Sequence, residues 1–194
     1  MREWPRIAAA SRVYPGETVC GDQVSWWREG PATLACIADG LGHGPDAHRA
    51  AQTLLALLEG QPEIDLAQRL VTGDRAMRHT RGAAAALVRI DPGTRIVTVA
   101  AVGNIQGALF GARTRRFDGT PGIVGAGLRH LKPLDLPFAC DDLLILWTDG
   151  LRPVDLGTDP TVPHEDPERL AAQLMASLGR QSDDCAVLCI TFGE

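Results

Sequence analysis

The stretch that most constrains the fold of this chain is Ala35–Gly44, which reads ACIADGLGHG. An apolar, strand-like run ends in Asp39 and Gly40, and further glycines and Pro45 follow directly. A carboxylate at the end of a buried strand, with glycines that let backbone approach a ligand, suits a hard cation or a phosphate. Asp-Gly is also common in ordinary turns, so this segment alone leaves both interpretations open.

A second acidic residue, Asp22, is predicted to lie beside Asp39. Alternating side chains after Asp22 indicate a strand, and Glu29-Gly30-Pro31 predicts a hairpin turn into the strand that ends at Asp39. In an antiparallel hairpin, the start of the first strand lies beside the end of the second. Two carboxylates at one sheet edge repel each other unless a cation joins them.

The remaining pattern predicts three helices and about ten strands. Apolar spacing predicts a helix over Pro45–Leu58 and a weaker one over about 64–79, and an N-cap pattern starts a third at Asp166 that runs to about Leu178. The expected strands cover 6–14, 24–28, 32–39, 83–91, 94–102, 106–110, 111–117, 130–138, 143–148 and 185–192, and 155–166 is expected to be a loop. Helices and strands do not alternate regularly, so we predict an α+β fold of mainly antiparallel sheets with helices packed outside.

Length and composition narrow the class of protein. The 194 residues contain no repeat, low-complexity segment or linker, which predicts one domain over 1–194. A net charge of −5 argues against a nucleic-acid binder. No apolar run approaches the roughly 20 residues that span a bilayer, and no signal peptide is recognisable, so we expect a cytoplasmic protein. The 5 cysteines form no Cys-x-x-Cys pair, which favours reduced thiols, buried at Cys36, Cys185 and Cys189, over a zinc site.

Acidic residues recur at the predicted strand ends. Asp22 and Asp39 are joined by Asp149, which again stands in an apolar-strand-Asp-Gly pattern, and by the pair Asp183-Asp184. Each of these residues could form an ordinary turn or helix cap. Together, without adjacent lysine or arginine, their negative charges would destabilise the fold unless a positive charge compensates them. Ligands that are oxygen only favour magnesium or manganese over zinc or copper.

Seven short motifs, spread over nearly the whole chain, carry a resemblance to a known family. They are Cys20-Gly21-Asp22, ADGLGHG at 38–44, RGAAAALV at 81–88, Val102-Gly103-Asn104, GIVG at 122–125, WTDG at 147–150 and DDCAV at 183–187. In type and order they resemble the PPM-type metal-dependent serine/threonine protein phosphatases, and most of all the bacterial stage-II-sporulation and stress-response branch. The short chain, without a sensor or coiled-coil segment, is similar to the stand-alone phosphatase of that branch that resets the stressosome.

The resemblance implies a PPM phosphatase-like αββα sandwich, two stacked antiparallel sheets flanked by helices, with two metal ions at one end. It implies that Asp39 bridges two Mg²⁺ or Mn²⁺ ions and that the Gly40 carbonyl binds one of them. Asp149 and Asp183 would hold the other ion, and Asp22 would contact the ions directly or through water.

Three further positions have open roles. Asp184 stands where the family has Asp or Asn. His43 either donates a proton or steers the loop, or else packs or caps there, and Asn104 either lines the site or forms a turn. The Arg-rich N-terminal motif with which some larger members bind phosphate is absent, and Arg6 and Arg12 are either substitutes or plain surface charge.

The function that the resemblance implies is hydrolysis of phosphoserine and phosphothreonine by a dimetal-activated water. The implied substrates are phosphorylated stress-signalling scaffold or anti-sigma-antagonist (STAS) proteins, and we expect a monomer that binds neither nucleic acid nor membrane. A phosphatase-fold module that binds a partner without turnover and a phosphatase of a small phosphorylated metabolite remain alternatives. An ATP-binding domain of the histidine-kinase type would leave Asp149 and Asp183 unexplained.

Overall fold

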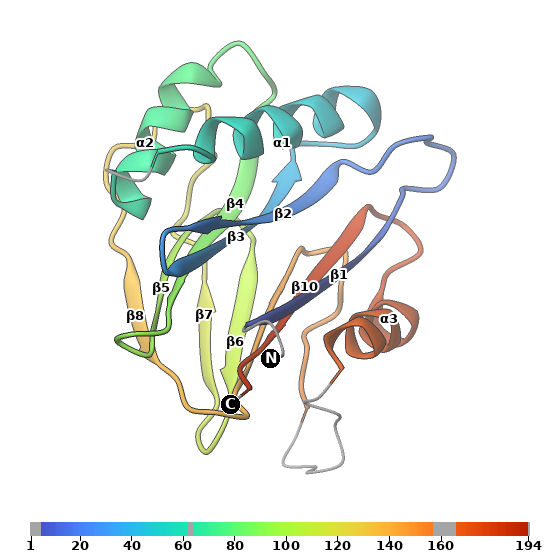
Figure 1. Ribbon diagram of the computed structural model, residues 1–194. Coiled ribbons are helices and arrows are strands. Elements are labelled where there is room, and N and C mark those ends of the chain that lie inside the picture. The colour runs from blue at the N-terminus through green and yellow to red at the C-terminus, as the bar shows by residue number, and fades with distance from the viewer. Residues whose placement is uncertain (1–4, 62–63, 157–165, 194) are drawn as a thin grey trace.

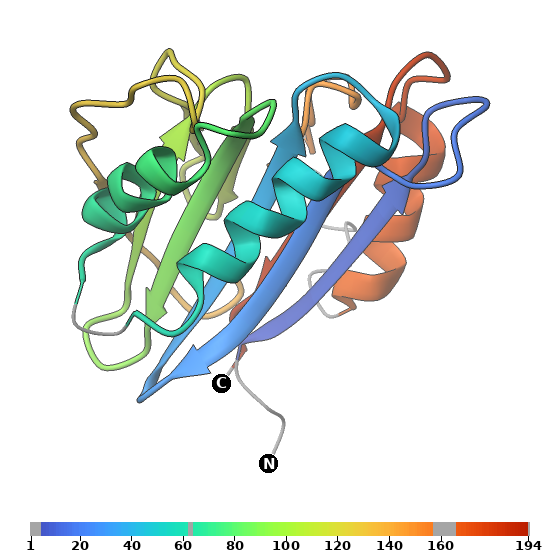
Figure 2. The ribbon, with the colours of Figure 1, turned by 90° about the horizontal axis from the view of Figure 1, so that it is seen from above.

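Residues 5–61, 64–156 and 166–193 are described by the structure, a computed structural model, and they form two stacked five-stranded sheets (Figures 1 and 2). The strands are β1 (Arg6–Arg12), β2 (Asp22–Glu29), β3 (Ala32–Gly40), β4 (Ala83–Asp91), β5 (Ile96–Val102), β6 (Gln106–Phe110), β7 (Arg115–Asp118), β8 (Leu134–Pro137), β9 (Leu143–Trp147) and β10 (Cys185–Thr191). The helices are α1 (Gly44–Leu58), α2 (Leu66–Ala76) and α3 (Pro167–Leu178).

All strand pairings within the two sheets are antiparallel. One sheet has the order β1-β10-β9-β6-β7 and the other β2-β3-β4-β5-β8. Alternate side chains of both sheets point inward and form a shared apolar core, which includes Ile37, Val88, Leu146 and Leu188. The predicted α+β fold of two stacked antiparallel sheets is therefore confirmed.

Helices cover the outer faces of the two sheets, as predicted. Helix α1 lies along the sheet that contains β3, and its apolar stripe is buried there, at Ala47, Ala50, Ala51, Leu54 and Leu58 (Figure 2). Helix α3 packs on the sheet that contains β10. Its start is capped as the sequence predicts, because the Asp166 carboxylate accepts hydrogen bonds from the N–H groups of Glu168 and Arg169.

Several predicted boundaries are too wide. Helix α2 begins only after Asp65, whose carboxylate accepts a hydrogen bond from the N–H of Gln68, and it ends in a turn at Met77. Strand β8 covers four residues of the predicted 130–138, and β7 begins only at Arg115. Most of the predicted 155–166 loop lies outside the described residues.

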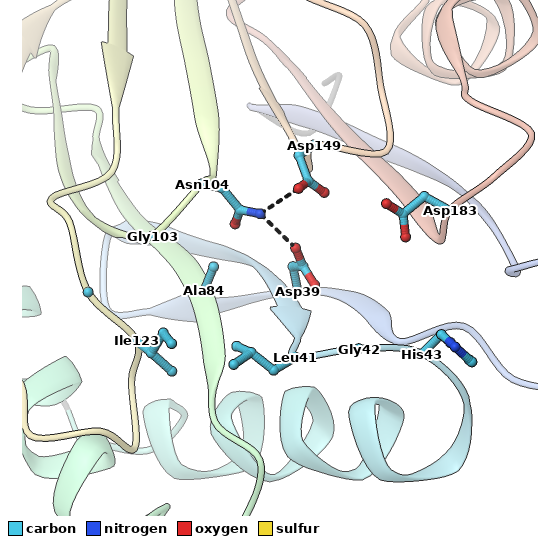
Figure 3. A pocket seen from close by; sticks show the side chains of 11 residues that line it. Asp39, Leu41, Gly42, His43, Ala84, Gly103, Asn104, Ile123, Asp149 and Asp183 are labelled. Carbon is cyan, nitrogen blue, oxygen red and sulfur yellow. Dashed lines mark hydrogen bonds between the residues drawn. The ribbon is translucent and has the colours of Figure 1, made fainter.

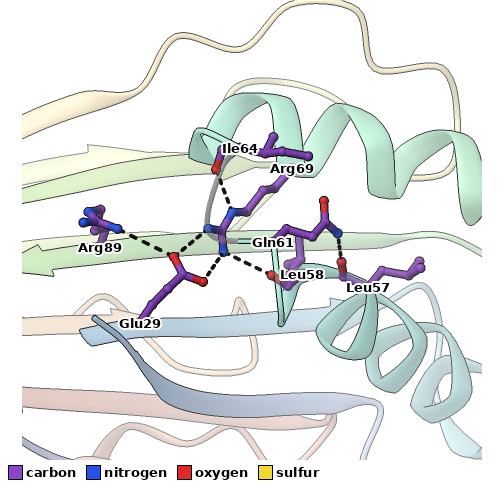
Figure 4. A network of polar contacts seen from close by, with 7 residues as sticks. All are labelled: Glu29, Leu57, Leu58, Gln61, Ile64, Arg69 and Arg89. Carbon is purple, nitrogen blue, oxygen red and sulfur yellow. Dashed lines mark hydrogen bonds and ion pairs between the residues drawn. The ribbon is translucent and has the colours of Figure 1, made fainter. Parts of the chain in front are cut away.

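A buried ion pair anchors α2 to the β2–β3 hairpin (Figure 4). Arg69 is 1% exposed, and its two terminal nitrogens lie 3.1 and 2.6 Å from the two carboxylate oxygens of Glu29. The same guanidinium donates to the backbone carbonyls of Leu58 and Ile64, and Arg89 lies 3.6 Å from Glu29. Because the Arg69 guanidinium is paired with a carboxylate and also donates to two backbone carbonyls, the cost of burying its charge is compensated.

Arg12 also has a structural role, different from both roles considered from the sequence. Its guanidinium donates to the carbonyl oxygens of Met175 at 2.7 Å and Gly179 at 3.2 Å. Both carbonyls lie at the C-terminal end of α3, and that of Met175 also accepts a hydrogen bond from the N–H of Gly179. Arg12 therefore joins β1 to the C-terminal end of α3.

The cysteines are free thiols in the structure. Cys20, Cys36, Cys185 and Cys189 are buried, and Cys140 is partly exposed. No helix in the described part of the chain is long and apolar enough to cross a membrane.

Candidate active site

The first two acidic residues face each other across one strand pair. Asp22, the first residue of β2, is the direct partner of Asp39 in the β2–β3 register. The predicted proximity of these two carboxylates is therefore confirmed. Asp22 is buried at 2% exposure, whereas Asp39 is partly exposed at the end of its strand.

The second sheet brings two more carboxylates to the same end of the molecule. Asp149 follows the end of β9, and Asp183 precedes the start of β10, the antiparallel neighbour of β9. Asp39, Asp149 and Asp183 line one cavity of about 380 Å³ and point into it (Figure 3). Its other lining residues are Leu41, Gly42, His43, Ala84, Gly103, Asn104, Gly122 and Ile123.

Asn104 joins the two sheets across this cavity. Its side-chain nitrogen donates hydrogen bonds to Asp149 Oδ2 at 2.7 Å and to Asp39 Oδ2 at 3.3 Å (Figure 3). Of the two roles that the sequence left open, the structure places Asn104 in the lining of the site.

The glycines of the two Asp-Gly pairs are needed for close packing. A Cβ atom on Gly40 would lie 2.0 Å from the Ala47 carbonyl oxygen of α1, and one on Gly150 would lie 1.8 Å from the Asp184 carbonyl oxygen. Neither glycine has a positive φ, so turn conformation does not explain them. Each glycine instead lets a neighbouring backbone segment come next to the acidic residue.

The carboxylates perturb one another. Burial, followed by the charge of Asp39, raises the pKa of Asp22 well above its usual range. Burial, followed by the charge of Asp149, raises the pKa values of Asp39 and Asp183. A cation between these carboxylates would remove the repulsion that raises the pKa values of Asp22, Asp39 and Asp183.

The donor set fits hard divalent cations. Asp22 Oδ2 is buried and has no hydrogen-bond partner, and the same holds for Asp184 Oδ2, so both oxygens retain free ligand capacity. Among the described residues, no three His, Cys, Asp or Glu side chains gather tightly enough to enclose one ion by themselves. Such a sparse all-oxygen set suits Mg²⁺ or a similar ion, which keeps several waters in its shell.

Asp184, like Asp22, is set back from the cavity that Asp39, Asp149 and Asp183 line. It is buried, is not part of the cavity lining, and its Oδ1 accepts a hydrogen bond from the N–H of Tyr14 at 2.8 Å. Asp184 thus holds the chain between β1 and β2 close to the site.

Thr148 is a supporting residue that the sequence reasoning did not single out. It is fully buried, and its hydroxyl accepts a hydrogen bond from the N–H of Ala186 at 2.9 Å. A hydrogen bond from Thr148 also partly offsets the raised pKa of Asp22. The only available signal was its place directly before Asp149 in WTDG.

His43 lies at the rim of the cavity, where α1 begins. Its ring stacks on Tyr14 with centroids 4.2 Å apart, and its Nδ1 lies 2.6 Å from Glu17 Oε1. It precedes α1 without a side-chain cap hydrogen bond. These contacts fix the loop between Asp39 and α1.

Known structures share this fold over almost the whole chain. A structure from a study described as "The bacterial stressosome: a modular system that has been adapted to control secondary messenger signaling" is 30% identical, with a TM-score of 0.87 over 97% of this chain and 100% of that one. RsbX in complex with magnesium has a TM-score of 0.82 at 21% identity, covering 97% of this chain and 96% of that chain. The PP2C phosphatase domain of SpoIIE from Bacillus subtilis, solved with a fragment of its regulatory domain, also has a TM-score of 0.82. It is 22% identical, and the match covers 97% of this chain and 62% of that chain.

Two sheets flanked by helices give this chain the fold of the PP2C-type phosphatase domains, and carboxylates of both sheets lie at one end of it. Within that class, the chain belongs to the family of Stage II sporulation protein E (SpoIIE), whose model matches residues 29–193. Among curated proteins, Phosphoserine phosphatase RsbX of Bacillus subtilis (strain 168) is 26% identical over 143 residues, which are 73% of this chain and 72% of RsbX. The chain is a metal-dependent serine/threonine phosphatase, and the fold excludes the ATP-binding domain of the histidine-kinase type.

Proposed function

We propose that this phosphatase removes phosphate from phosphoserine or phosphothreonine on stress-signalling proteins, with two Mg²⁺ or Mn²⁺ ions held by the acidic residues described above. The observation that carries the site assignment is the convergence of Asp39, Asp149 and Asp183 in one cavity, with the buried Asp22 paired with Asp39 across β2 and β3.

The proposed ligands come from both sheets. Asp39 would bridge the two ions, the Gly40 carbonyl would bind one, and Asp149 and Asp183 would bind the other. Asp22 and the free oxygen of Asp184 would complete the shells directly or through water. When bound, the two ions supply a lowered pKa for a water molecule and neutralise charge on the phosphoryl oxygens.

The residues of the chain position these carboxylates and shape the cavity. Asn104 orients Asp39 and Asp149 by donating to one oxygen of each, which leaves the other oxygen of each carboxylate free. Leu41 and Ile123 form apolar walls beside them (Figure 3). A cavity rich in carboxylates repels a phosphate group, so productive binding of the substrate requires the cations.

The partner class follows from similarity. The curated relative is named a phosphoserine phosphatase, and the solved structure that is 30% identical comes from a study of the stressosome. We therefore propose phosphorylated stressosome or STAS-type proteins as substrates.

The test is hydrolysis of p-nitrophenyl phosphate with manganese, with and without EDTA, by the wild type and by Asp39→Asn. We expect turnover that EDTA abolishes and that Asp39→Asn lowers by at least about 100-fold, since the proposed bridging ligand is lost. Asp135→Asn is the matched control, because Asp135 is exposed on β8 and is not part of the cavity lining.

Each contrary result has a definite meaning. Activity that survives Asp39→Asn would contradict the metal assignment. A folded wild type without turnover under any metal would favour the non-catalytic binding module. Turnover of a small phosphorylated metabolite, but not of a phosphoserine protein, would favour the metabolite phosphatase.

A further inference from the structure

A second cavity, of about 370 Å³, lies between the C-terminal end of α2 and the loop that follows Val124. We call it the basic cleft. One wall comes from the end of α2 and the turn after it, with Val71, Asp74, Arg75 and Arg78, and the other from residues 126–130, with Leu128, Arg129 and His130. Figure 2 shows this loop, in yellow, beside α2.

The arginines of the basic cleft have no ion-pair partner among the residues that the structure describes. Arg75, Arg78 and Arg129 are exposed, and none of them lies within 4.0 Å of a carboxylate oxygen there. In a chain with a net charge of −5, three unpaired guanidinium groups around one cavity form a local positive field.

The single carboxylate of the cleft, Asp74, is engaged through one of its two oxygens, and its buried Oδ2 has no hydrogen-bond partner. Its Oδ1 accepts hydrogen bonds from the N–H groups of Gly125 at 2.7 Å and Gly127 at 2.9 Å. Burial raises the pKa of Asp74, but hydrogen bonds from the backbone of Leu128, Gly125 and Gly127, together with the charge of Arg78, lower it below its usual value. Asp74 therefore stays ionised and fixes the loop, and its one negative charge does not balance three arginines.

Helix capping explains only part of this cluster. Arg75 stands in the last turn of α2, where a cation is favoured by the helix dipole. That argument does not apply to Arg129 or His130, which come from the opposite wall. The guanidinium groups on the two walls of the cavity repel each other, and an anion between them would reduce this repulsion.

One short loop links the basic cleft to the cavity that Asp39, Asp149 and Asp183 line, which we call the catalytic cavity. Gly122 and Ile123 line the catalytic cavity, and Ala126 and Gly127 line the basic cleft. The four Cα–Cα steps from Ile123 to Gly127 span at most about 14 Å. A backbone pairing between Val124 and Ala83 holds this loop against β4.

We propose that the basic cleft binds acidic side chains of the polypeptide substrate, about four to six residues from the phosphorylated serine. This inference rests on the proposed function, because the phosphorylated residue must occupy the catalytic cavity. A peptide fits better than an isolated phosphate or a lipid surface, since the two cavities lie along one loop at a spacing that an extended peptide covers.

The experiment compares two synthetic phosphoserine peptides that differ only four to six residues from the phosphoserine. One peptide carries a block of three glutamates at these positions, and the other carries three glutamines. Each peptide is made in two versions, with the block N-terminal or C-terminal to the phosphoserine. Both are assayed with the wild type, with Arg75→Gln/Arg129→Gln, and with Arg113→Gln as an exposed control on the β6–β7 turn. Arg78 is left unchanged, because its charge acts on Asp74.

We expect the wild type to favour the glutamate peptide, with the block on one side, by about three- to ten-fold in kcat/KM. This is the size expected for two exposed ion pairs, and it should arise mainly in KM and shrink as salt is added. The double variant should lose this preference and keep wild-type hydrolysis of p-nitrophenyl phosphate, whereas Arg113→Gln should change neither. Arg75→Glu/Arg129→Glu should instead favour a lysine-block peptide.

A preference that persists in the double variant, or no preference in the wild type, would overturn the proposal. So would binding of anionic lipid vesicles that the double variant loses while the peptide preference stays. Fluorescence anisotropy, used to measure binding of the unphosphorylated peptides, gives the same comparison without turnover. Failure of the proposed function would appear separately, as a wild type that does not hydrolyse p-nitrophenyl phosphate.

Discussion

At the scale of the residue, the main feature of the site is electrostatic repulsion between neighbouring carboxylates. Asp22 and Asp39 face each other in register, and Asp149 adds its charge to that of Asp39. Carboxylates arranged in this way are unfavourable for folding without a cation and favourable for binding one.

The first prediction is that Asp39→Asn stabilises the metal-free protein. In EDTA, the substitution removes one charge from the cluster, so we expect the midpoint of thermal unfolding to rise by a few degrees, for a gain of about 1 kcal/mol. The pKa values of Asp22 and Asp39 are raised in the folded state, so the native protein binds more protons than the unfolded chain. Its stability in EDTA should therefore fall as the pH rises above about 4, and less steeply in the variant.

Calorimetry in EDTA between pH 5 and 8, with Asp135→Asn as the matched control, checks this prediction. A variant less stable than the wild type over this whole range would show that the Asp39 carboxylate stabilises the fold by itself.

At the scale of the element, close backbone contact fixes how the strand ends meet. Gly150 packs against the backbone carbonyl of Asp184, where β9 ends and β10 is about to begin. This contact sets the spacing between Asp149 and Asp183.

Gly150→Ala is expected to lower the free energy of unfolding by about 3 kcal/mol, because the added Cβ would meet the Asp184 oxygen at 1.8 Å. Gly193→Ala is the control, since a Cβ there meets nothing within 4 Å. Urea unfolding measures both, and equal stability of the two variants would refute the packing argument. Activity of Gly150→Ala should fall as well, as the two carboxylates separate.

The link between α2 and the β2–β3 hairpin gives a second prediction at this scale. Glu29→Gln leaves the buried guanidinium of Arg69 without its carboxylate, so we expect a loss of about 3–5 kcal/mol in unfolding free energy. Adding Arg69→Met to Glu29→Gln should recover part of that loss, because the uncompensated charge disappears. Chemical denaturation of the single and double variants decides between this coupling and simple additivity.

At the scale of the whole molecule, the site exists only when both sheets are stacked. Asp22 and Asp39 belong to one sheet, whereas Asp149 and Asp183 adjoin strands of the other, and Asn104 connects the two. Cations bound between them would therefore hold the sheets together.

We accordingly expect manganese to raise the thermal unfolding midpoint of the wild type. At a free-ion concentration about 100 times the dissociation constant, the gain is about 2.7 kcal/mol for each site, or roughly 5–10 °C for a chain of this length. Asp39→Asn should lose most of the shift, and Arg75→Gln/Arg129→Gln should keep it. Differential scanning fluorimetry with a manganese titration measures this, and an unshifted wild type would contradict the proposed metal centre.

The order of helices and strands, the fold class and the pairing of Asp22 with Asp39 could be predicted from the amino-acid sequence alone. Apolar periodicity records which face of each helix or strand is buried, and a hairpin fixes the register of its two strands through local geometry. The α1 helix, the β2–β3 hairpin and the capped start of α3 could therefore be predicted to within a few residues.

Which residues far apart in the chain contact each other could be seen only in the folded structure. The sequence suggested a shared site from resemblance, but the convergence of Asp39 with Asp149 and Asp183 depends on how two sheets stack. The same is true of Asn104 bridging two carboxylates, of Arg12 capping α3, and of the basic cleft. Each of these features brings together residues that are far apart in the chain. Helix and strand patterns in the sequence reflect only local hydrogen bonding and burial, so they do not predict these contacts.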